Sequence, residues 1–99
     1  SPVYAEGFLV KGALDCGRFL SSCDSSLKHL NCQVHTSWSL GFITGMNYSI
    51  YGGKQKVGKD VTYDTIKHAL IKYCRDNPLK DTVDAIEDVY LKLHKKATR

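Results

Sequence analysis

Four cysteines in a chain of 99 residues are the strongest constraint on how this sequence folds. They stand at Cys16, Cys23, Cys32 and Cys74. An even number of cysteines in so short a chain favours a disulfide framework made in an oxidising compartment, and four cysteines allow three pairings. We therefore expect two disulfides and a periplasmic or secreted protein.

We favour the pairing of Cys16 with Cys74 and of Cys23 with Cys32, and the spacing alone leaves the other pairings open. The first bridge would close a loop over residues 17–73 and would contribute about 4 kcal/mol in the chain-entropy description. The second bridge would clip the polar, serine-rich segment between its two cysteines.

A zinc site is the alternative use of these cysteines. Cys23, His29, Cys32 and His35 lie close together in the sequence, and Cys32-x-x-His35 has a plausible ligand spacing. A tight Cys-x-x-Cys pair is missing, however. We therefore favour a disulfide with two surface histidines, and we expect neither a metal nor a cofactor.

Apolar residues recur at helical spacing, and no segment alternates with the period of two that marks a strand. After an irregular arm over residues 1–13, Asp15 caps a short helix that carries Leu14, Phe19 and Leu20. Asn31 caps a long helix over roughly residues 33–51. Its apolar stripe is formed by Val34, Trp38, Phe42 and Met46, widened by Ile43 and Ile50, and Gly52 and Gly53 end it.

Two further helices follow the lysine-rich connection. Thr62 or Asp60 caps the third helix, which ends before Pro78 and buries Tyr63, Ile66, Leu70, Tyr73 and Cys74. The last helix begins near Pro78 or Asp81 and buries Leu79, Val83, Ile86, Tyr90 and Leu93. We expect a single all-α domain over residues 1–99, a small disulfide-stapled bundle of three main helices and a short N-terminal one, with its core in 14–93 and a basic tail in 94–99.

Gly41 and Gly45 lie four residues apart inside the second helix. A glycine in a helix interior costs about 1 kcal/mol relative to alanine, so some other interaction should offset it. Small residues at this spacing let another helix approach closely. We expect a helix crossing at these two positions.

Other classes of protein are not favoured. No stretch approaches the roughly 18 apolar residues of a transmembrane helix. The net charge of +4 and the pI of about 8.9 are lower than in a dedicated nucleic-acid-binding domain. No nucleophile, metalloprotease or nucleotide motif is present, and we expect no enzyme. Met46 is the only methionine, so we expect any signal peptide to have been removed.

Tyrosines with polar neighbours are typical of protein-binding surfaces. We expect such a surface near the end of the second helix, where lysines would suit an acidic cleft of a partner. The candidate contacts are Tyr48, Tyr51, Lys54, Lys56 and Tyr63. The oligomeric state is left open, with a homodimer among the possibilities.

Three segments, DCGRFL, WSLGFITGMN and IKYCRDNPLKDTVDAI, resemble a group of small exported bacterial domains. The group includes HdeA-type acid-stress chaperones and Rap/Tai-type immunity proteins, which neutralise secreted peptidoglycan amidases. The resemblance covers residues 14–93 and rests on Trp38, Gly41, Gly45, Asn47, Cys74, Asn77 and Pro78. It implies an HdeA-like bundle in which a Cys16–Cys74 disulfide joins the first and third helices and the glycines lie where helices cross.

These observations predict an exported periplasmic binding protein of the inhibitor or immunity kind. It would bind and block a protein partner such as a secreted cell-wall amidase or another envelope component. One alternative is an acid-stress holdase, in which protonated carboxylates loosen the fold and expose apolar side chains. Another is an accessory subunit of an envelope complex.

Overall fold

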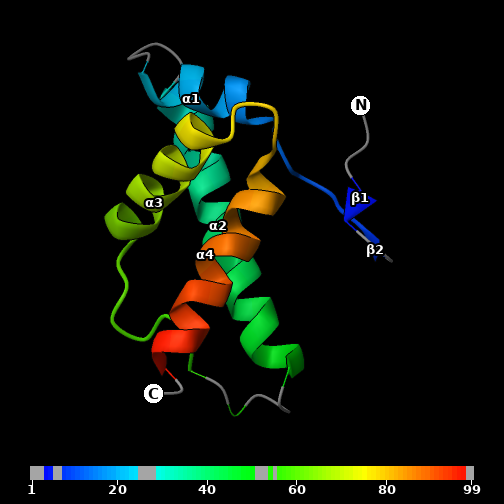
Figure 1. Cartoon of the computed structure of the whole chain (residues 1–99), viewed down its shortest axis with the longest axis vertical. Helices are drawn as coiled ribbons and strands as arrows, with labels where there is room; N and C mark the ends of the chain where they lie inside the picture. The colour runs from blue at the N-terminus through cyan, green and yellow to red at the C-terminus, as the bar shows by residue number, and fades with distance from the viewer. Residues whose placement is uncertain (1–3, 6–7, 25–28, 51–53, 55, 98–99) are drawn as a thin grey trace.

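The chain is described here by a computed structural model, which covers residues 4–5, 8–24, 29–50, 54 and 56–97. Within these residues the model contains helices α1 (Cys16–Asp24), α2 (His29–Ser49), α3 (Tyr63–Asp76) and α4 (Thr82–Ala97) (Figure 1). Two-residue strands β1 (Tyr4–Ala5) and β2 (Phe8–Leu9) pair antiparallel in the N-terminal arm. The predicted all-α bundle of three long helices and a short N-terminal helix is confirmed.

Both predicted disulfides are present. Cys16 and Cys74 join α1 to α3, with their Cα atoms 5.0 Å apart. Cys23 and Cys32 join the end of α1 to α2, with Cα atoms 4.9 Å apart. Cys16, Cys74 and Cys32 are fully buried and Cys23 is partly buried, so the first bridge lies within the hydrophobic core and the second at its edge.

The predicted core faces of α3 and α4 are confirmed in most positions. The Thr62 hydroxyl accepts a hydrogen bond from the Thr65 N–H (3.2 Å) and so caps α3, whose Ile66, Leu70 and Cys74 are buried. Val83, Ile86 and Tyr90 are buried on α4. Leu79 is the exception, because it lies in the turn before α4 and is 98% exposed.

Two predictions for α2 are wrong. The helix begins at His29, so Asn31 lies inside it and does not cap it. The buried face is also rotated from the predicted stripe: Val34 is 50% exposed and Trp38, Phe42 and Met46 are only partly buried, whereas Cys32, Thr36 and Ser39 are buried beside the predicted Ile43. The Thr36 and Ser39 hydroxyls donate to backbone carbonyls one turn earlier, so their burial leaves no polar group unpaired.

The predicted helix crossing at Gly41 and Gly45 is also wrong. Both glycines are exposed, and a Cβ atom added at either would meet no described atom within 4 Å. The physical reason is the rotated face of α2. Gly41 lies on the side of the helix opposite Ser39 and Ile43, which pack into the core.

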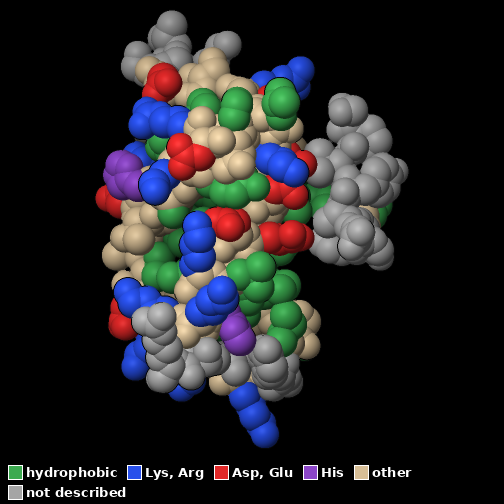
Figure 2. Space-filling model, viewed as in Figure 1, with side chains coloured by type: hydrophobic (Ala, Val, Ile, Leu, Met, Phe, Trp, Pro, Cys, Tyr) green, Lys and Arg blue, Asp and Glu red, His purple; other side chains and the backbone are tan. Residues whose placement is uncertain are grey.

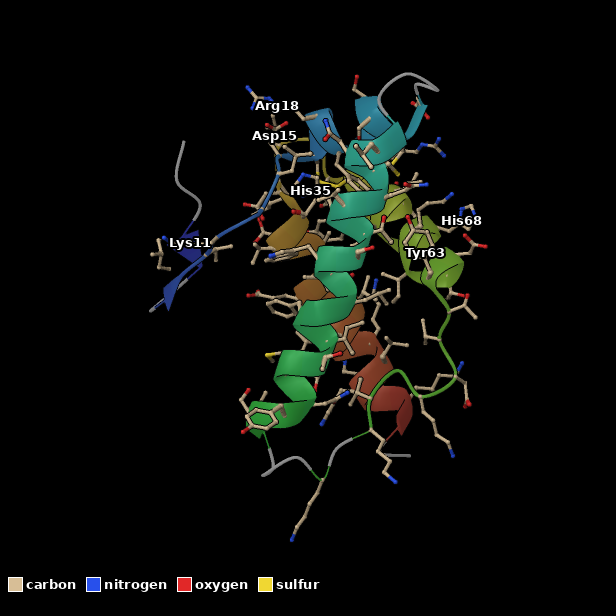
Figure 3. The ribbon with its side chains drawn as sticks, turned by 180° about the vertical axis from the view of Figure 1, so that it is seen from behind. Lys11, Asp15, Arg18, His35, Tyr63 and His68 are labelled. Atoms are coloured by element: carbon tan, nitrogen blue, oxygen red, sulfur yellow. A yellow bond between two sulfur atoms is a disulfide. The ribbon has the colours of Figure 1, made fainter. Side chains whose placement is uncertain are left out.

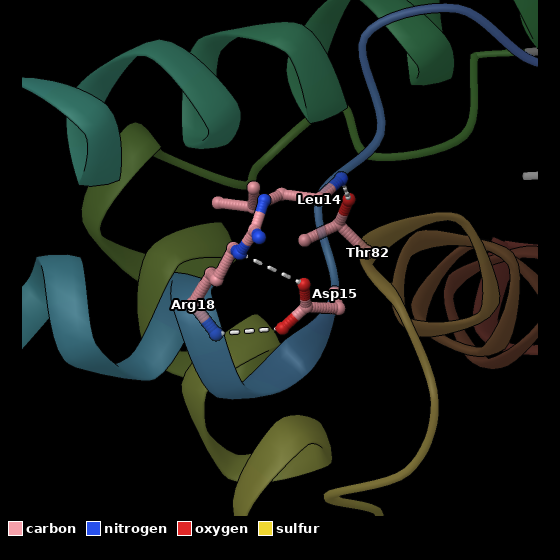
Figure 4. Close-up of polar contacts among 4 residues, drawn as sticks. All are labelled: Leu14, Asp15, Arg18 and Thr82. Atoms are coloured by element: carbon pink, nitrogen blue, oxygen red, sulfur yellow. Dashed lines mark hydrogen bonds and ion pairs between the residues drawn. The ribbon is translucent and has the colours of Figure 1, made fainter. Parts of the chain in front are cut away.

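The segments that lead into α1 and α4 pair with each other, although they are far apart in the sequence. Asp15 and Asp81 form an isolated antiparallel bridge. Three hydrogen bonds surround it. Thr82 N–H donates to Leu14 O (2.8 Å), and Cys16 N–H donates to Lys80 O (2.9 Å). Leu14 N–H donates to Thr82 Oγ1 (2.9 Å), as Figure 4 shows. The two helices therefore start side by side.

The same two aspartates cap the helices. Asp15 Oδ1 accepts a hydrogen bond from the Arg18 N–H (2.8 Å), and its second oxygen lies 3.4 Å from Arg18 Nε (Figure 4). Asp81 Oδ1 accepts from the Asp84 N–H (3.0 Å). We call residues 14–18 and 80–84, together with the Cys16–Cys74 bridge, the capped end of the bundle.

Trp38 connects the N-terminal arm to α2 through a hydrogen bond. Its indole Nε1–H donates to the Lys11 carbonyl (2.9 Å). Gly12 has φ +91°, and a Cβ atom there would lie 2.8 Å from Trp38 Nε1, so only glycine fits this approach. Trp38 also packs against Phe42, with ring centroids 5.8 Å apart.

Candidate functional site

The connection between α2 and α3 is held in place by one side chain, Asn47. Its Nδ2 donates to the Val57 carbonyl (2.9 Å), and its Oδ1 accepts from the Val57 N–H (3.3 Å). The Tyr90 hydroxyl lies 3.2 Å from the same Oδ1 and donates to it. Asn47 therefore ties the connection to both α2 and α4.

Packing and a turn complete this anchor. Val57 is buried. Gly58 has φ +82°, its carbonyl accepts from the Val61 N–H (3.0 Å), and an added Cβ would lie 3.6 Å from Ile43 Cγ2. A connection with this many fixed backbone groups presents its exposed side chains from a defined position.

Those exposed side chains are lysines. Lys56 and Lys59 flank the buried Val57, and the last turn of α4 brings Lys96 to the same hollow. The hollow has a volume of about 660 Å³ and is lined by Lys56, Gly58, Lys59, Asp60, Val61, Thr65, Leu93 and Lys96. We call Lys56, Lys59 and Lys96 the basic end; it lies at the bottom of Figures 1 and 2.

A second hollow, of about 400 Å³, lies on the α2 side of the same connection. It is lined by Leu40, Ile43, Thr44, Asn47, Lys56, Val57, Gly58, Lys59 and Val61. Lys56 and Lys59 therefore border both hollows, and each is accessible from two sides.

The predicted contact residues lie at different places in the structure. Lys56 is part of the basic end, while Lys54 is exposed but lines neither hollow. Tyr48 is 82% exposed on the last turn of α2 and also lies outside both hollows. Tyr51 lies outside the described residues.

Tyr63, the last of the predicted contact residues, is less exposed than a surface contact would be. It is half-buried on the first turn of α3, and its buried hydroxyl has no hydrogen-bond partner in the described part of the chain. Figure 3 shows it on the same helix as His68, away from the arm residue Lys11. It lies on the first turn of α3 and lines neither hollow.

Sequence reasoning missed Lys59 and Lys96 as site residues and Asn47 as their anchor. The lysines at 54–59 and 92–96 are visible in the sequence as two separate groups. Only the fold brings Lys96 beside Lys56, because α4 ends next to the connection. One signal for the anchor was available in the sequence. Asn47 is a polar residue on a predicted helix, and it stands ten positions before Val57, a hydrophobic residue in a glycine-rich loop.

The first half of α4 has the opposite charge. Burial raises the pKa of Asp84, and the neighbouring negative charge of Asp81 raises it further. Burial, together with the charges of Asp84 and Asp81, also raises the pKa of Glu87. The pKa of Tyr73 is raised by burial and by the same group of carboxylates. The helix therefore runs from an acidic start to a basic last turn.

The described residues offer no metal site and no membrane span. Among them, no group of three His, Cys, Asp or Glu side chains could hold a metal ion. Cys23 and Cys32, the thiols of the zinc alternative, are bonded to each other. No described helix is both long enough and apolar enough to cross a membrane.

No protein-family model, curated protein or solved structure matches the chain. The resemblance to HdeA-type and Rap/Tai-type domains therefore stays a prediction.

Proposed function

We propose that this chain is an exported binding protein of the inhibitor or immunity kind, which docks its basic end on an acidic cleft of a partner protein and blocks it. The observation that carries this proposal is the Asn47 anchor, which holds Lys56 and Lys59 beside Lys96. A connection whose backbone is held before binding loses less conformational freedom when its lysines meet carboxylates, and the lysines steer the encounter with an acidic surface.

The two disulfides support export, since such bridges persist in oxidising compartments. A partner in that compartment would be a secreted cell-wall amidase or another envelope protein with carboxylates around its active cleft. Three lysines around one hollow match a small acidic cleft better than they match the long phosphate backbone of a nucleic acid.

The raised pKa values of two carboxylates on α4 argue against the acid-triggered holdase. That mechanism needs carboxylates that stabilise the fold when ionised. The pKa values of Asp84 and Glu87 are instead raised in the folded protein, so protonation of these two groups favours the folded state. An accessory subunit of an envelope complex would use the same basic end without blocking an active site.

The test is capture from an envelope extract at pH 7 and again near pH 3, with the partners identified by mass spectrometry. Three forms of the folded, oxidised protein are compared: the wild type, Lys56→Glu/Lys59→Glu/Lys96→Glu, and Lys11→Glu/Lys72→Glu/Lys80→Glu. Both variants change the net charge equally, and the control lysines are exposed and lie outside the basic end. We expect one stoichiometric partner at pH 7 that the control retains and the basic-end variant loses.

The activity of the captured partner is then assayed with and without the protein. Inhibition by the wild type and not by the basic-end variant supports a blocking function, whereas unchanged activity indicates an accessory subunit. Equal capture by both variants would contradict docking through the basic end. Many unrelated proteins bound only in acid would indicate a holdase.

A further inference from the structure

A second surface, separate from the basic end, is an open apolar groove between α2 and α4. It has a volume of about 400 Å³ and is lined by Phe42, Met46, Glu87, Tyr90 and Leu91. This volume lies within the range of roughly 300–1,000 Å³ that ligand pockets occupy. Figure 2 shows hydrophobic side chains gathered on the right of the lower half, with Asp and Glu side chains directly above them.

The groove runs along the helices. Phe42 and Met46 are one turn apart on α2, and Glu87 and Leu91 are one turn apart on α4. Side chains four residues apart form the ridges between which another helix packs. No residue of α3 lines this groove, and Leu91 is 62% exposed. Among the described helices, only α2 and α4 therefore border this groove.

The charge at the groove decides which kind of helix fits. Glu87 is the only ionisable carboxylate among the lining residues, and it forms no ion pair with any described residue. Its half-buried position beside apolar side chains disfavours the charged form, and Asp84 one turn earlier adds negative charge. A cation brought next to Glu87 would relieve both effects.

We propose that the α2–α4 groove docks an amphipathic helix of a partner protein that carries Lys or Arg beside its apolar face. The apolar side chains would pack on Phe42, Met46 and Leu91, and the cation would pair with Glu87. This is helix-in-groove recognition with a charged rim. The groove would bind a cationic helix, whereas the basic end would bind carboxylates, so the two surfaces do not compete for the same part of a partner.

The net charge of the chain opposes the binding of a cationic helix. With a net charge of +4, the protein as a whole repels a cationic helix. Binding of such a helix therefore needs a local acidic and apolar site, and general electrostatic attraction cannot produce it.

The test is a titration of the isotope-labelled, oxidised protein with an 18-residue helical peptide of leucine and lysine, followed by NMR and by calorimetry. A second peptide has the same leucine positions and glutamate in place of lysine. We expect the Leu/Lys peptide to bind at least tenfold more tightly and to shift the signals of the groove residues. Leu91→Asp should weaken this binding about tenfold or more, and Glu87→Gln should weaken it about fivefold.

Matched controls test whether the site is local. Leu79→Asp replaces an exposed leucine outside the groove, and Asp64→Asn removes an exposed carboxylate on α3. Both should bind the peptide as the wild type does, and so should the basic-end variant Lys56→Glu/Lys59→Glu/Lys96→Glu. The last control separates failure of this proposal from failure of the proposed function.

Three results would overturn the proposal. The first is equal binding of the Leu/Lys peptide by Leu91→Asp with its helical content unchanged by circular dichroism. The second is equal binding of the two peptides. The third is a dimer of the wild type in sedimentation equilibrium that Leu91→Asp dissociates, because the groove would then hold a second copy of this chain.

Discussion

At the capped end, the starts of α1 and α4 are joined by a backbone bridge, two aspartate caps and a buried disulfide. At the basic end, the connection that carries Lys56 and Lys59 is held by one side chain, Asn47, together with the buried Val57. Both ends contain exposed charge, but only the capped end has several independent restraints.

The capped end maintains the fold, and the basic end carries the proposed binding surface. Restraints that do not depend on one another keep the fold intact when one of them is lost. A region held by one side chain opens at a lower free energy than the rest of the domain. The basic end is therefore where a single substitution should alter binding while the bundle stays folded.

The largest effect should come from the capped end. Replacing both Cys16 and Cys74 by alanine removes a bridge that closes a long loop, and we expect a loss of about 4 kcal/mol in the free energy of unfolding. Replacing Cys23 and Cys32 opens a much shorter loop and should cost about 2.5 kcal/mol. Urea unfolding of both double variants measures the two values; equal losses would contradict loop closure as the main contribution.

Asn47→Ala breaks the anchor of the basic end. It leaves the buried Val57 N–H and C=O without their partner, and we expect a cost of about 2 kcal/mol. Asn47→Asp keeps the acceptor for the Val57 N–H but sets a carboxylate oxygen against the Val57 carbonyl, so we expect it to cost at least as much as Asn47→Ala. Urea unfolding gives both values, and proteolysis of the connection should accelerate more than that of the helices. An unchanged cleavage rate would show that Val57 alone holds the connection.

The aspartate caps allow a finer comparison within the capped end. Asp15→Ala and Asp81→Ala should each cost about 1 kcal/mol, since each removes the acceptor for one N–H of a first helical turn. Thermal unfolding of the two variants and of the pair measures these values. Because the two caps are separate restraints, their losses should add in the double variant, and a clear deviation from additivity would show that the paired segments couple them.

Gly45→Ala should stabilise the protein by about 0.5–1 kcal/mol. The residue is exposed inside α2, and the added Cβ meets no described atom within 4 Å. Gly12→Ala should have the opposite effect. Gly12 has a positive φ and lies against Trp38, so an alanine there should destabilise the protein. A lower melting temperature for Gly45→Ala would indicate that a partner or an undescribed residue packs there.

The smallest effect concerns pH and the acidic start of α4. The pKa values of Asp84 and Glu87 lie above the ordinary 3.8 and 4.5, so their contribution to stability is complete below those values and is lost as the pH rises through the raised ones. Between about pH 4 and pH 7 the wild type should therefore lose stability relative to Asp84→Asn/Glu87→Gln. Parallel unfolding curves at the two pH values would contradict the direction of these pKa shifts.

The helical fold and both disulfides were predictable, because the periodicity of α3 and α4 is strong. The favoured pairing joined two predicted helices through Cys16 and Cys74 and clipped the polar segment between Cys23 and Cys32. The buried face of α2 was not. Thr36 and Ser39 lie in the core with their hydroxyls bonded within the helix, whereas the apolar residue Val34 faces outward. A pattern based on hydrophobic residues alone places these polar positions on the surface.

The candidate site was only partly predictable for a similar reason. Lys56 was identified from its own segment, but the hollow needs Lys96 from the end of α4. Asn47 looked like one more polar residue near the end of a helix, and its role depends on hydrogen bonds to a residue ten positions away. Such contacts between separate elements follow from the tertiary packing and leave no local pattern in the sequence.

The Cys16–Cys74 bridge also determines how the protein behaves after a cut in its backbone. The connection at residues 56–61 lies between the two bridged positions in the chain. If a protease in the surrounding compartment cleaved there, the two fragments would stay covalently linked and would run as one band in a gel without reductant. The helices would keep their mutual contacts, so the bundle would stay assembled while the cut connection no longer held its lysines in a defined position.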